Sequence, residues 1–296
     1  MPSPSPNPLP SAEVRRARPL LGTLVEIQAT GAAPQARLHA AVDAAFAAVE
    51  QVHRRMSFHE AGSTVSALNR EALQRPLRVD AQTWAVLAAA QRLSRLSEGA
   101  FDIAVGAPLR DWGYLPAGLP GPAGPPFDGN WTDIELLEDC RVRFHRPLLI
   151  DLGGIAKGYA VDCAIAVLRQ AGVEGALVNA GGDLRTFGAP QQVQLRHPQA
   201  PALVSHTLTL CDEALATSAN YYSRRDTAAG AVAPLLDPRR RQPWLGAASV
   251  SVRAADCMSA DALTKVVLFA APEAAERVLA AYGAQAYVQQ PAASAA

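Results

Sequence analysis

The chain has 296 residues, which is long enough for one large domain or two tightly packed lobes. Its 27 Lys plus Arg balance its 27 Asp plus Glu, so no net charge draws it to nucleic acid or to an acidic membrane surface. With 18% charged residues and many alanines, the composition excludes a largely disordered chain and predicts a compact globular protein without nucleic-acid partners.

The ends of the chain and its cysteines give no sign of export. The first eight residues, MPSPSPNP, are too rich in proline for a signal-peptide helix, and we find no lipoprotein motif and no apolar run long enough for membrane insertion. The four cysteines are too far apart for a zinc site or a disulfide scaffold. We therefore expect a cytoplasmic protein with a disordered tail over 1–13, one domain over 14–290 and a flexible C-terminus over 291–296.

The first third of the domain alternates strand and helix patterns. Residues 20–29 alternate apolar and polar side chains, which predicts a strand. The alanine-rich stretch 35–55 has apolar residues at helical intervals and contains no proline, which predicts a long helix. Asp80 is placed to cap a second helix, and Gly99 marks the end of that segment.

The middle and the end of the chain interleave strands and helices without a repeat. Prolines and glycines exclude regular structure over 115–130, which predicts a surface loop. A short strand, a glycine turn and a helix ending near Gly172 follow, and further strands are predicted near 176–180, 205–210 and 248–253. This order favours an α+β fold with mixed sheets and packed helices over a doubly wound sheet.

The stretch from Asp151 to Asp162 is the most informative for function. A strand that ends in glycines and leads directly into a helix lets a ligand approach the backbone, and the unpaired N–H groups of the helix start favour an anion such as phosphate. Lys157 in the first turn would add a cation, and Asp151 could accept a hydrogen bond from a sugar hydroxyl or a ring N–H. The alternative is a tight strand-to-helix connection that binds nothing.

The same stretch resembles the signature of the ApbE-type FAD:protein FMN transferases. Eight partial matches follow one another in that family's order over nearly the whole chain after the tail. They are LLGTLVEI, SFHEAGSTVSALN, FDIAVGAPLRDWGY, DLGGIAKGYAVD, NAGGDLRTFG, ATSANYY, LLDP and SADAL.

The resemblance implies a fold, a reaction and a set of site residues. The fold would be the T-fold-like flavin transferase domain, and the reaction would move FMN from FAD onto a Ser or Thr hydroxyl of a target flavoprotein with release of AMP. Magnesium at the diphosphate would face the Gly154 carbonyl and the Asp261 carboxylate, since hard cations take oxygen ligands. The residues that would line FAD are Leu21, His59, Ala100, Phe101, Asp102, Asp151, Lys157 and Leu235.

Several of these residues also have an ordinary structural interpretation. Leu21 and Phe101 could simply belong to the core. Asp102 could cap a turn. Two charged residues of the helix that follows the glycine turn, Asp162 and Arg169, are expected on a solvated face.

The chain departs from the family at three positions. Leu21 replaces a methionine, a swap that conserves volume. Pro234 replaces a histidine that relatives place three residues before the aspartate matched by Asp237, and if that histidine is a general base, its loss slows transfer by roughly a hundredfold. Lys265 replaces a threonine that relatives place four residues after the aspartate matched by Asp261. With these departures, the candidate catalytic residues that the resemblance implies are Asp261, Lys265 and Asp237.

The change at Lys265 leaves three interpretations open. Thr264 could reach the magnesium after a local shift. The Lys265 ammonium could take the place of the cation and neutralise the diphosphate without a metal. Lys265 and Asp261 could form an ordinary ion pair between residues four apart on a helix.

These departures also keep a second function open. A family member that binds FAD but has lost transfer, acting as a flavin carrier, a regulator or a weak FAD hydrolase, would tolerate both Pro234 and Lys265. A nucleotide-dependent oxidoreductase would need a dinucleotide fingerprint that the sequence does not contain.

Overall fold

A computed structural model describes residues 12–117, 127–198, 200–220, 223–228 and 230–290. Positions 1–11 of the predicted tail, positions 118–126 of the predicted Pro/Gly-rich loop and the predicted flexible end at 291–296 lie outside these ranges. Strand β1 (Ala12–Leu20) pairs with β2 (Thr23–Gly31) from its first residue onward, so Ala12 and Glu13 belong to the sheet and not to the tail.

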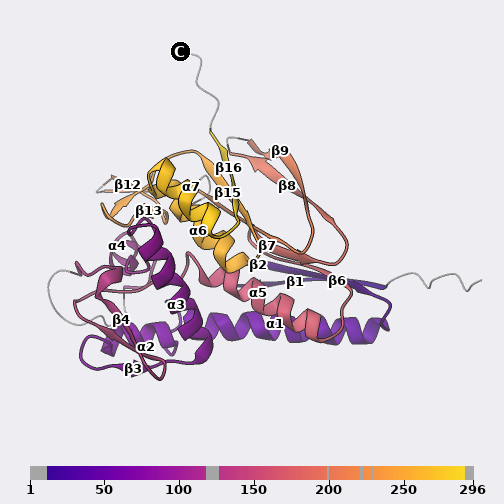
Figure 1. Ribbon diagram of the computed structural model, residues 1–296, viewed down its shortest axis with the longest axis horizontal. Helices are drawn as coiled ribbons and strands as arrows, with labels where there is room; N and C mark the ends of the chain where they lie inside the picture. The colour runs from indigo at the N-terminus through magenta and orange to yellow at the C-terminus, as the bar shows by residue number, and fades with distance from the viewer. Residues whose placement is uncertain (1–11, 118–126, 199, 221–222, 229, 291–296) are drawn as a thin grey trace, which may run out of the picture.

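A seven-stranded sheet forms the centre of the molecule (Figure 1). All of its pairings are antiparallel. In β2 the alternation of buried and less buried residues turns Val25, Ile27 and Ala29 towards the core, where none is exposed, as the alternating pattern predicts. After β1 and β2, the order continues with β6 (Gly175–Ala180), β7 (Asp183–Phe187), β10 (Ala214–Ala219), β15 (Ser249–Ala254) and β16 (Gln285–Gln289).

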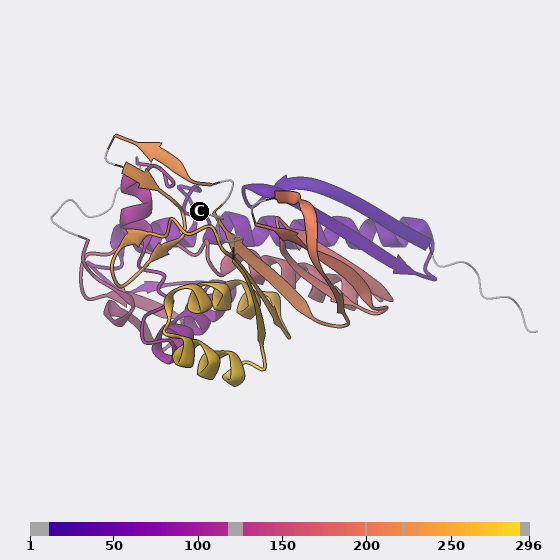
Figure 2. The same ribbon diagram turned by 90° about the horizontal axis from the view of Figure 1, so that it is seen from above.

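Three helices lie side by side on the sheet. Helix α1 (Gln35–Met56) packs on β1 and β2, α5 (Ala156–Gln170) on β6 and β7, and α6 (Cys257–Phe269) on β10 and β15. Figure 2 shows α1 running the length of the strands. One face of α1 is buried because its apolar residues recur every three or four positions, so the predicted long helix is confirmed. Helix α7 (Pro272–Ala281) packs on α6 and β16.

The hairpin of β8 (Gln191–His197) and β9 (Ala200–Leu210) packs on a different part of the sheet. Leu195 and Leu210 of the hairpin form a small apolar cluster with Leu184 of β7 and Leu215 of β10. This cluster is separate from the main core, which the three helices share with the sheet.

The remaining elements gather beyond one end of the sheet, at the left of Figure 1. Helix α3 is capped by Asp80, whose carboxylate accepts the N–H groups of Gln82 and Thr83, as the sequence predicts. The helices of this part are α2 (Thr64–Glu71), α3 (Ala81–Leu96), α4 (Gly106–Asp111) and a 3₁₀ turn at Trp131–Asp133. The strands are β3 (Leu77–Arg78), β4 (Ile134–Leu137), β5 (Arg141–Phe144), β11 (Arg225–Thr227), β12 (Gly230–Val232), β13 (Leu236–Asp237) and β14 (Gln242–Pro243).

The predicted α+β class is confirmed. The expectation of mixed sheets is corrected in one respect, because every strand pairing in the described ranges is antiparallel. None of the helices in these ranges is long and apolar enough to cross a bilayer.

Candidate active site

A cavity of about 740 Å³ opens between the end of the sheet and the elements beyond it. Segments from distant parts of the sequence line it, and most of the residues singled out from the sequence are among them. The lining includes Leu21, His59, Ala100, Phe101, Asp102, Asp151, Gly154, Lys157, Leu235 and Lys265. Three of the predicted residues, Asp237, Asp261 and Thr264, do not line the cavity directly.

The apolar wall of the cavity is made by residues that also belong to the core. Phe101 is only 3% exposed and Ala100 is fully buried, yet both border the cavity. Leu21 stands in the turn between β1 and β2 with φ of 57°, a left-handed conformation unusual for a leucine, and is half-buried at the cavity wall. The core interpretation and the binding interpretation of these side chains are therefore compatible.

Two carboxylates on the cavity wall are held by backbone N–H groups. Asp102 accepts the N–H of Ala104 at 2.7 Å and that of Trp131 at 3.0 Å, so it caps a turn as well as facing the cavity. Asp151 accepts the N–H of Gly153 at 3.0 Å. Burial raises the pKa of Asp102 to about 6 and raises that of Asp151, although the nearby charge of His59 opposes the rise at Asp151.

The start of α5 differs from the sequence-based expectation. We expected its N–H groups to be free for a phosphate, but the N–H of Ala156 donates to the carbonyl of Leu152 at 2.8 Å, and the N–H of Gly158 donates to the Asp261 carboxylate at 3.2 Å. A protein carboxylate therefore occupies part of the anion-binding position at this helix end. Positive charge for a ligand must come from side chains instead.

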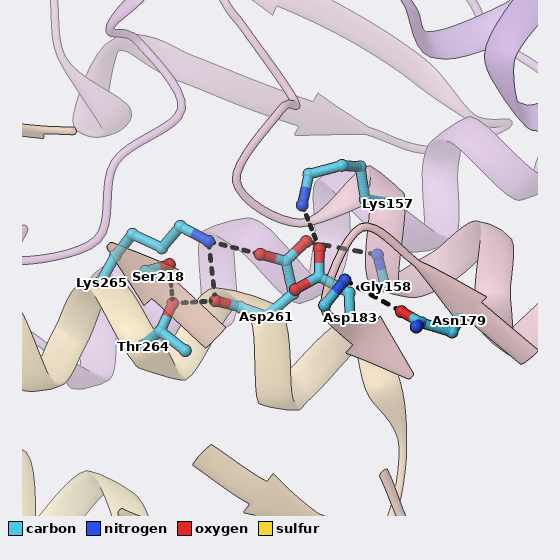
Figure 3. Close-up of polar contacts among 9 residues, drawn as sticks. Lys157, Gly158, Asn179, Asp183, Ser218, Asp261, Thr264 and Lys265 are labelled. Carbon is cyan, nitrogen blue, oxygen red and sulfur yellow. Dashed lines mark hydrogen bonds and ion pairs between the residues drawn. The ribbon is translucent and has the colours of Figure 1, made fainter. Parts of the chain in front are cut away.

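The ammonium groups of two lysines supply that positive charge, and each of them is paired with an aspartate (Figure 3). Lys157 pairs with Asp183 of β7, and Lys265 pairs with Asp261 one turn away on α6. The two aspartate side chains are 2% and 1% exposed, whereas the lysine side chains are 33% and 15% exposed. The carboxylates thus lie beneath the ammonium groups, and both lysines line the cavity.

The charges of this cluster shift one another's pKa. Burial alone would raise the pKa of Asp261, but the charges of Lys265 and Lys157 outweigh it and hold the pKa below the usual value. Burial and the neighbouring charge of Asp261 raise the pKa of Asp183. Burial would lower the pKa of Lys157, but Asp183 and Asp261 more than compensate and raise it.

Thr264 does not face the cavity. Its hydroxyl donates to the Asp261 carbonyl at 2.6 Å and lies 2.7 Å from the hydroxyl of Ser218 on β10, and its side chain is fully buried. The predicted metal ligand is therefore bound to the protein itself, a quarter turn away from Lys265.

The donor set does not fit a magnesium ion. The Asp261 carboxylate is shared by the Lys265 ammonium and the N–H of Gly158, and the same ammonium also donates to the Asp261 carbonyl at 3.0 Å. Among the described residues no three His, Cys, Asp or Glu side chains gather where they could hold a metal ion. A cation at Asp261 would first have to displace Lys265.

The segment around Pro234 offers no side-chain base. Pro234 lines the cavity at the place where the resemblance expects a histidine. Asp237 lies behind it, 20% exposed, and accepts the N–H of Arg239 at 3.0 Å in its own turn. The structure thus gives Asp237 a role in shaping this segment.

Asp183 and Ser218 were not among the predicted site residues, and Asp162 lies in a different environment from the one predicted. Asp183 follows Gly181 and Gly182 in the motif NAGGDLRTFG and begins β7, and Ser218 lies in β10 within the motif ATSANYY. Asp162, expected on a solvated helix face, is 15% exposed and pairs with Arg185. The position of Asp183 directly after two glycines is the sequence feature from which its place in the site could have been predicted.

Helices α5 and α6 pack closely against each other at the site. A Cβ on Gly158 would stand 2.1 Å from the carbonyl oxygen of Cys257, so only glycine fits there. Asp162 of α5 accepts the N–H groups of Cys257 at 3.0 Å and Met258 at 2.9 Å, two donors of the first turn of α6 that the N-cap Asp256 does not satisfy. These contacts fix the distance between the two lysine–aspartate pairs.

The chain is similar to known proteins over most of its length. The chain is 30% identical over 296 residues to an FAD:protein FMN transferase of Rhodobacter capsulatus, spanning 95% of this chain and 56% of the length of that relative. It is 30% identical over 271 residues to one of Vibrio cholerae, spanning 86% of this chain and 80% of that relative.

Solved structures and a family profile also match the chain. The ApbE protein from Thermotoga maritima superposes with a TM-score of 0.81 at 25% identity, covering 95% of this chain and 97% of that one. The flavin transferase ApbE from Vibrio cholerae has a TM-score of 0.75 at 26% identity, with 94% of each chain covered. The profile of the ApbE family matches residues 21–288, and the chain belongs to that family.

Proposed function

We propose that this protein is an FAD:protein FMN transferase, which moves FMN from FAD onto a Ser or Thr hydroxyl of a target protein. The observation that carries the proposal is the cavity, where an apolar wall for a ring system and two ammonium groups for a diphosphate border the same space. The similarity to the FAD:protein FMN transferases of Rhodobacter capsulatus and Vibrio cholerae supports it.

Different residues of the cavity would contact different chemical groups of FAD. Leu21, Ala100 and Phe101 would contact the flat faces of FAD. Asp151, with its raised pKa and with His59 nearby, would accept or share a hydrogen bond with a polar edge of the ligand. Lys157 would hold the diphosphate from the α5 side of the cavity.

The reaction balances as a displacement at phosphorus. The bond between the acceptor oxygen and the FMN phosphorus forms while the bond from that phosphorus to the oxygen of AMP breaks. One proton leaves the acceptor hydroxyl, and AMP carries away the oxygen that had bridged the two phosphates. The demand on the protein is to hold the partners in line and to neutralise charge on the phosphate oxygens.

Pro234 favours a second candidate, an FAD-binding protein with weak or no transfer. Its ring borders the cavity and cannot take the acceptor's proton. Such a protein would act as a flavin carrier, a regulator or an FAD hydrolase.

The test is incubation of the purified protein with FAD and a flavoprotein domain that carries an acceptor Thr, with and without magnesium. We expect free AMP by chromatography and an acceptor whose mass has increased by one FMN phosphoryl group. Bound FAD without any adduct would support the second candidate, and free FMN plus AMP in equal amounts would identify a hydrolase.

A further inference from the structure

Lysine is very rare in this chain. Of the 27 basic residues, 25 are arginines, and the two lysines are Lys157 and Lys265. Both lie in the same cavity, and each pairs with an aspartate that is almost completely buried. Lysine is therefore present only where a compact ammonium, and not the broad planar guanidinium of arginine, faces the site.

Lys265 is held in a fixed position. Its ammonium donates to the Asp261 carboxylate and, at 3.0 Å, to the Asp261 carbonyl. The stem of the side chain runs past the glycine turn, where a Cβ on Gly154 would lie 3.3 Å from its Cε atom. An ammonium has three N–H bonds, so one remains for a ligand in the cavity.

This position coincides with the one that the resemblance assigns to magnesium. The expected metal ligands were the Gly154 carbonyl and the Asp261 carboxylate. Lys265 contacts Asp261 directly (Figure 3), and its side-chain stem passes close to Gly154. Thr264, the alternative ligand, is turned towards Ser218. The ordinary surface pair is excluded as well, since Asp261 is 1% exposed.

We infer that the Lys265 ammonium takes the place of the divalent cation, so that Lys157 and Lys265 together neutralise the diphosphate of FAD without a metal ion. This inference rests on the proposed function for the identity of the ligand. It concerns a separate property, the source of the positive charge, and can fail while the transferase function stands.

The first test measures FAD binding from the quenching of flavin fluorescence, in excess EDTA and in excess magnesium. For the wild type we expect the two dissociation constants to agree within about twofold. For Lys265→Thr, which frees the Asp261 carboxylate and restores a hydroxyl on the same helix face, we expect binding in EDTA to weaken about tenfold to a hundredfold and to recover on addition of magnesium. Arg75→Thr is the matched control, because it removes an exposed i, i+4 pair with Glu71.

The second test uses the two lysines as probes. Isotope labelling restricted to lysine gives two side-chain NMR signals from the folded protein, and Lys265→Thr removes one of them and so assigns both. We expect FAD, and inorganic pyrophosphate on its own, to shift both signals in EDTA. Paramagnetic Mn²⁺ is expected to leave both signals sharp, with or without FAD, because no cation binds beside them.

The outcomes separate the two claims. Strong broadening of the Lys265 signal by Mn²⁺, or wild-type FAD binding that is lost in EDTA and restored by magnesium, would overturn the metal-free site. If pyrophosphate shifts both lysine signals in EDTA while FAD does not bind under any condition, the phosphate site stands and the transferase function falls. The comparison of wild-type FAD binding in EDTA and in magnesium needs no variant and no signal assignment, so a Lys265→Thr protein that fails to fold does not prevent a decision.

Discussion

At the scale of single residues, the site is defined by buried carboxylates and the cations above them. Asp183 and Asp261 are nearly inaccessible, and each would be an uncompensated buried charge without its lysine. Asp102 differs, because its two carboxylate oxygens are satisfied by backbone N–H groups and no lysine pairs with it. The two kinds of carboxylate should therefore respond differently to pH.

Asp102 should make the folded state less stable as pH rises. Burial raises its pKa from 3.8 to about 6, so between these values the folded protein binds more protons at this carboxyl than the unfolded chain does. The neutral form of Asp102 therefore favours folding at low pH, and its contribution to the free energy of unfolding is lost as pH rises through about 6.

We expect the difference in urea midpoint between the wild type and Asp102→Asn to shift in favour of the variant as pH rises from about 4 to about 6. Other carboxyls titrate in both proteins and cancel in the difference. A midpoint difference that stays constant over this range would show that Asp102 is ionised throughout it.

Substitution of Pro234 by histidine is expected to increase the rate of FMN transfer. Pro234→His places an imidazole at the cavity wall, where it can take the proton of the acceptor hydroxyl. We expect the rate of FMN transfer to rise by roughly a hundredfold, measured as AMP release under saturating FAD. Pro34→His, at an exposed position before α1, serves as the control and should leave the rate unchanged. An unchanged rate in Pro234→His would mean that proton removal does not limit transfer.

At the scale of elements, the contact between α5 and α6 sets the geometry of the site. Gly158 lets the two helices approach so closely that a side chain would collide with the backbone at Cys257. Through the same contact, the N–H of Gly158 reaches Asp261, and Asp162 accepts the N–H of Cys257 in the first turn of α6. Separating the helices would therefore move Lys157 away from Lys265.

Gly158→Ala should destabilise the fold by about 3 kcal/mol, because the added methyl overlaps backbone atoms that cannot move independently of α6. Gly62→Ala is the matched control and should change stability by less than about 0.5 kcal/mol, since nothing lies within 4 Å of the new Cβ and Gly62 does not adopt a positive φ. Urea denaturation measures both. Equal stability of the two variants would contradict the close packing of α5 on α6.

At the scale of the whole molecule, the cavity lies between the sheet with its helices and the elements beyond its end. Its walls come from the β1–β2 turn, the segment around Phe101, the glycine turn, β10, the segment around Pro234 and the middle of α6. A ligand that touches all of these segments binds the folded state alone. Ligand binding should therefore stabilise the whole domain.

FAD at a hundred times its dissociation constant should raise the melting temperature by on the order of 5 °C, corresponding to about 2.7 kcal/mol of added stability of the folded state. The rise should be the same in EDTA as in magnesium. Differential scanning fluorimetry with a dye that does not overlap flavin emission measures it. AMP alone, which lacks the flavin and one phosphate, should give a smaller shift.

The sequence by itself determined several of the elements and indicated the family. Periodic apolar residues predicted α1, Asp80 predicted the start of α3, and the collinear motifs identified the flavin transferase resemblance. These features depend on neighbours along the chain, so local patterns are sufficient to reveal them. The same patterns named ten of the residues that line the cavity.

Only the tertiary structure decided how the charges are arranged. No role was predicted for Asp183, and Asp162 was expected on a solvated face. Folding buries the Asp183 carboxylate beside Lys157 and leaves Asp162 only 15% exposed beside Arg185. The structure also turned Thr264 towards Ser218 and placed Lys265 on Asp261. The contacts of Asp183, Asp162 and Thr264 join residues more than twenty positions apart, and sequence spacing carries no information about which of these residues meet.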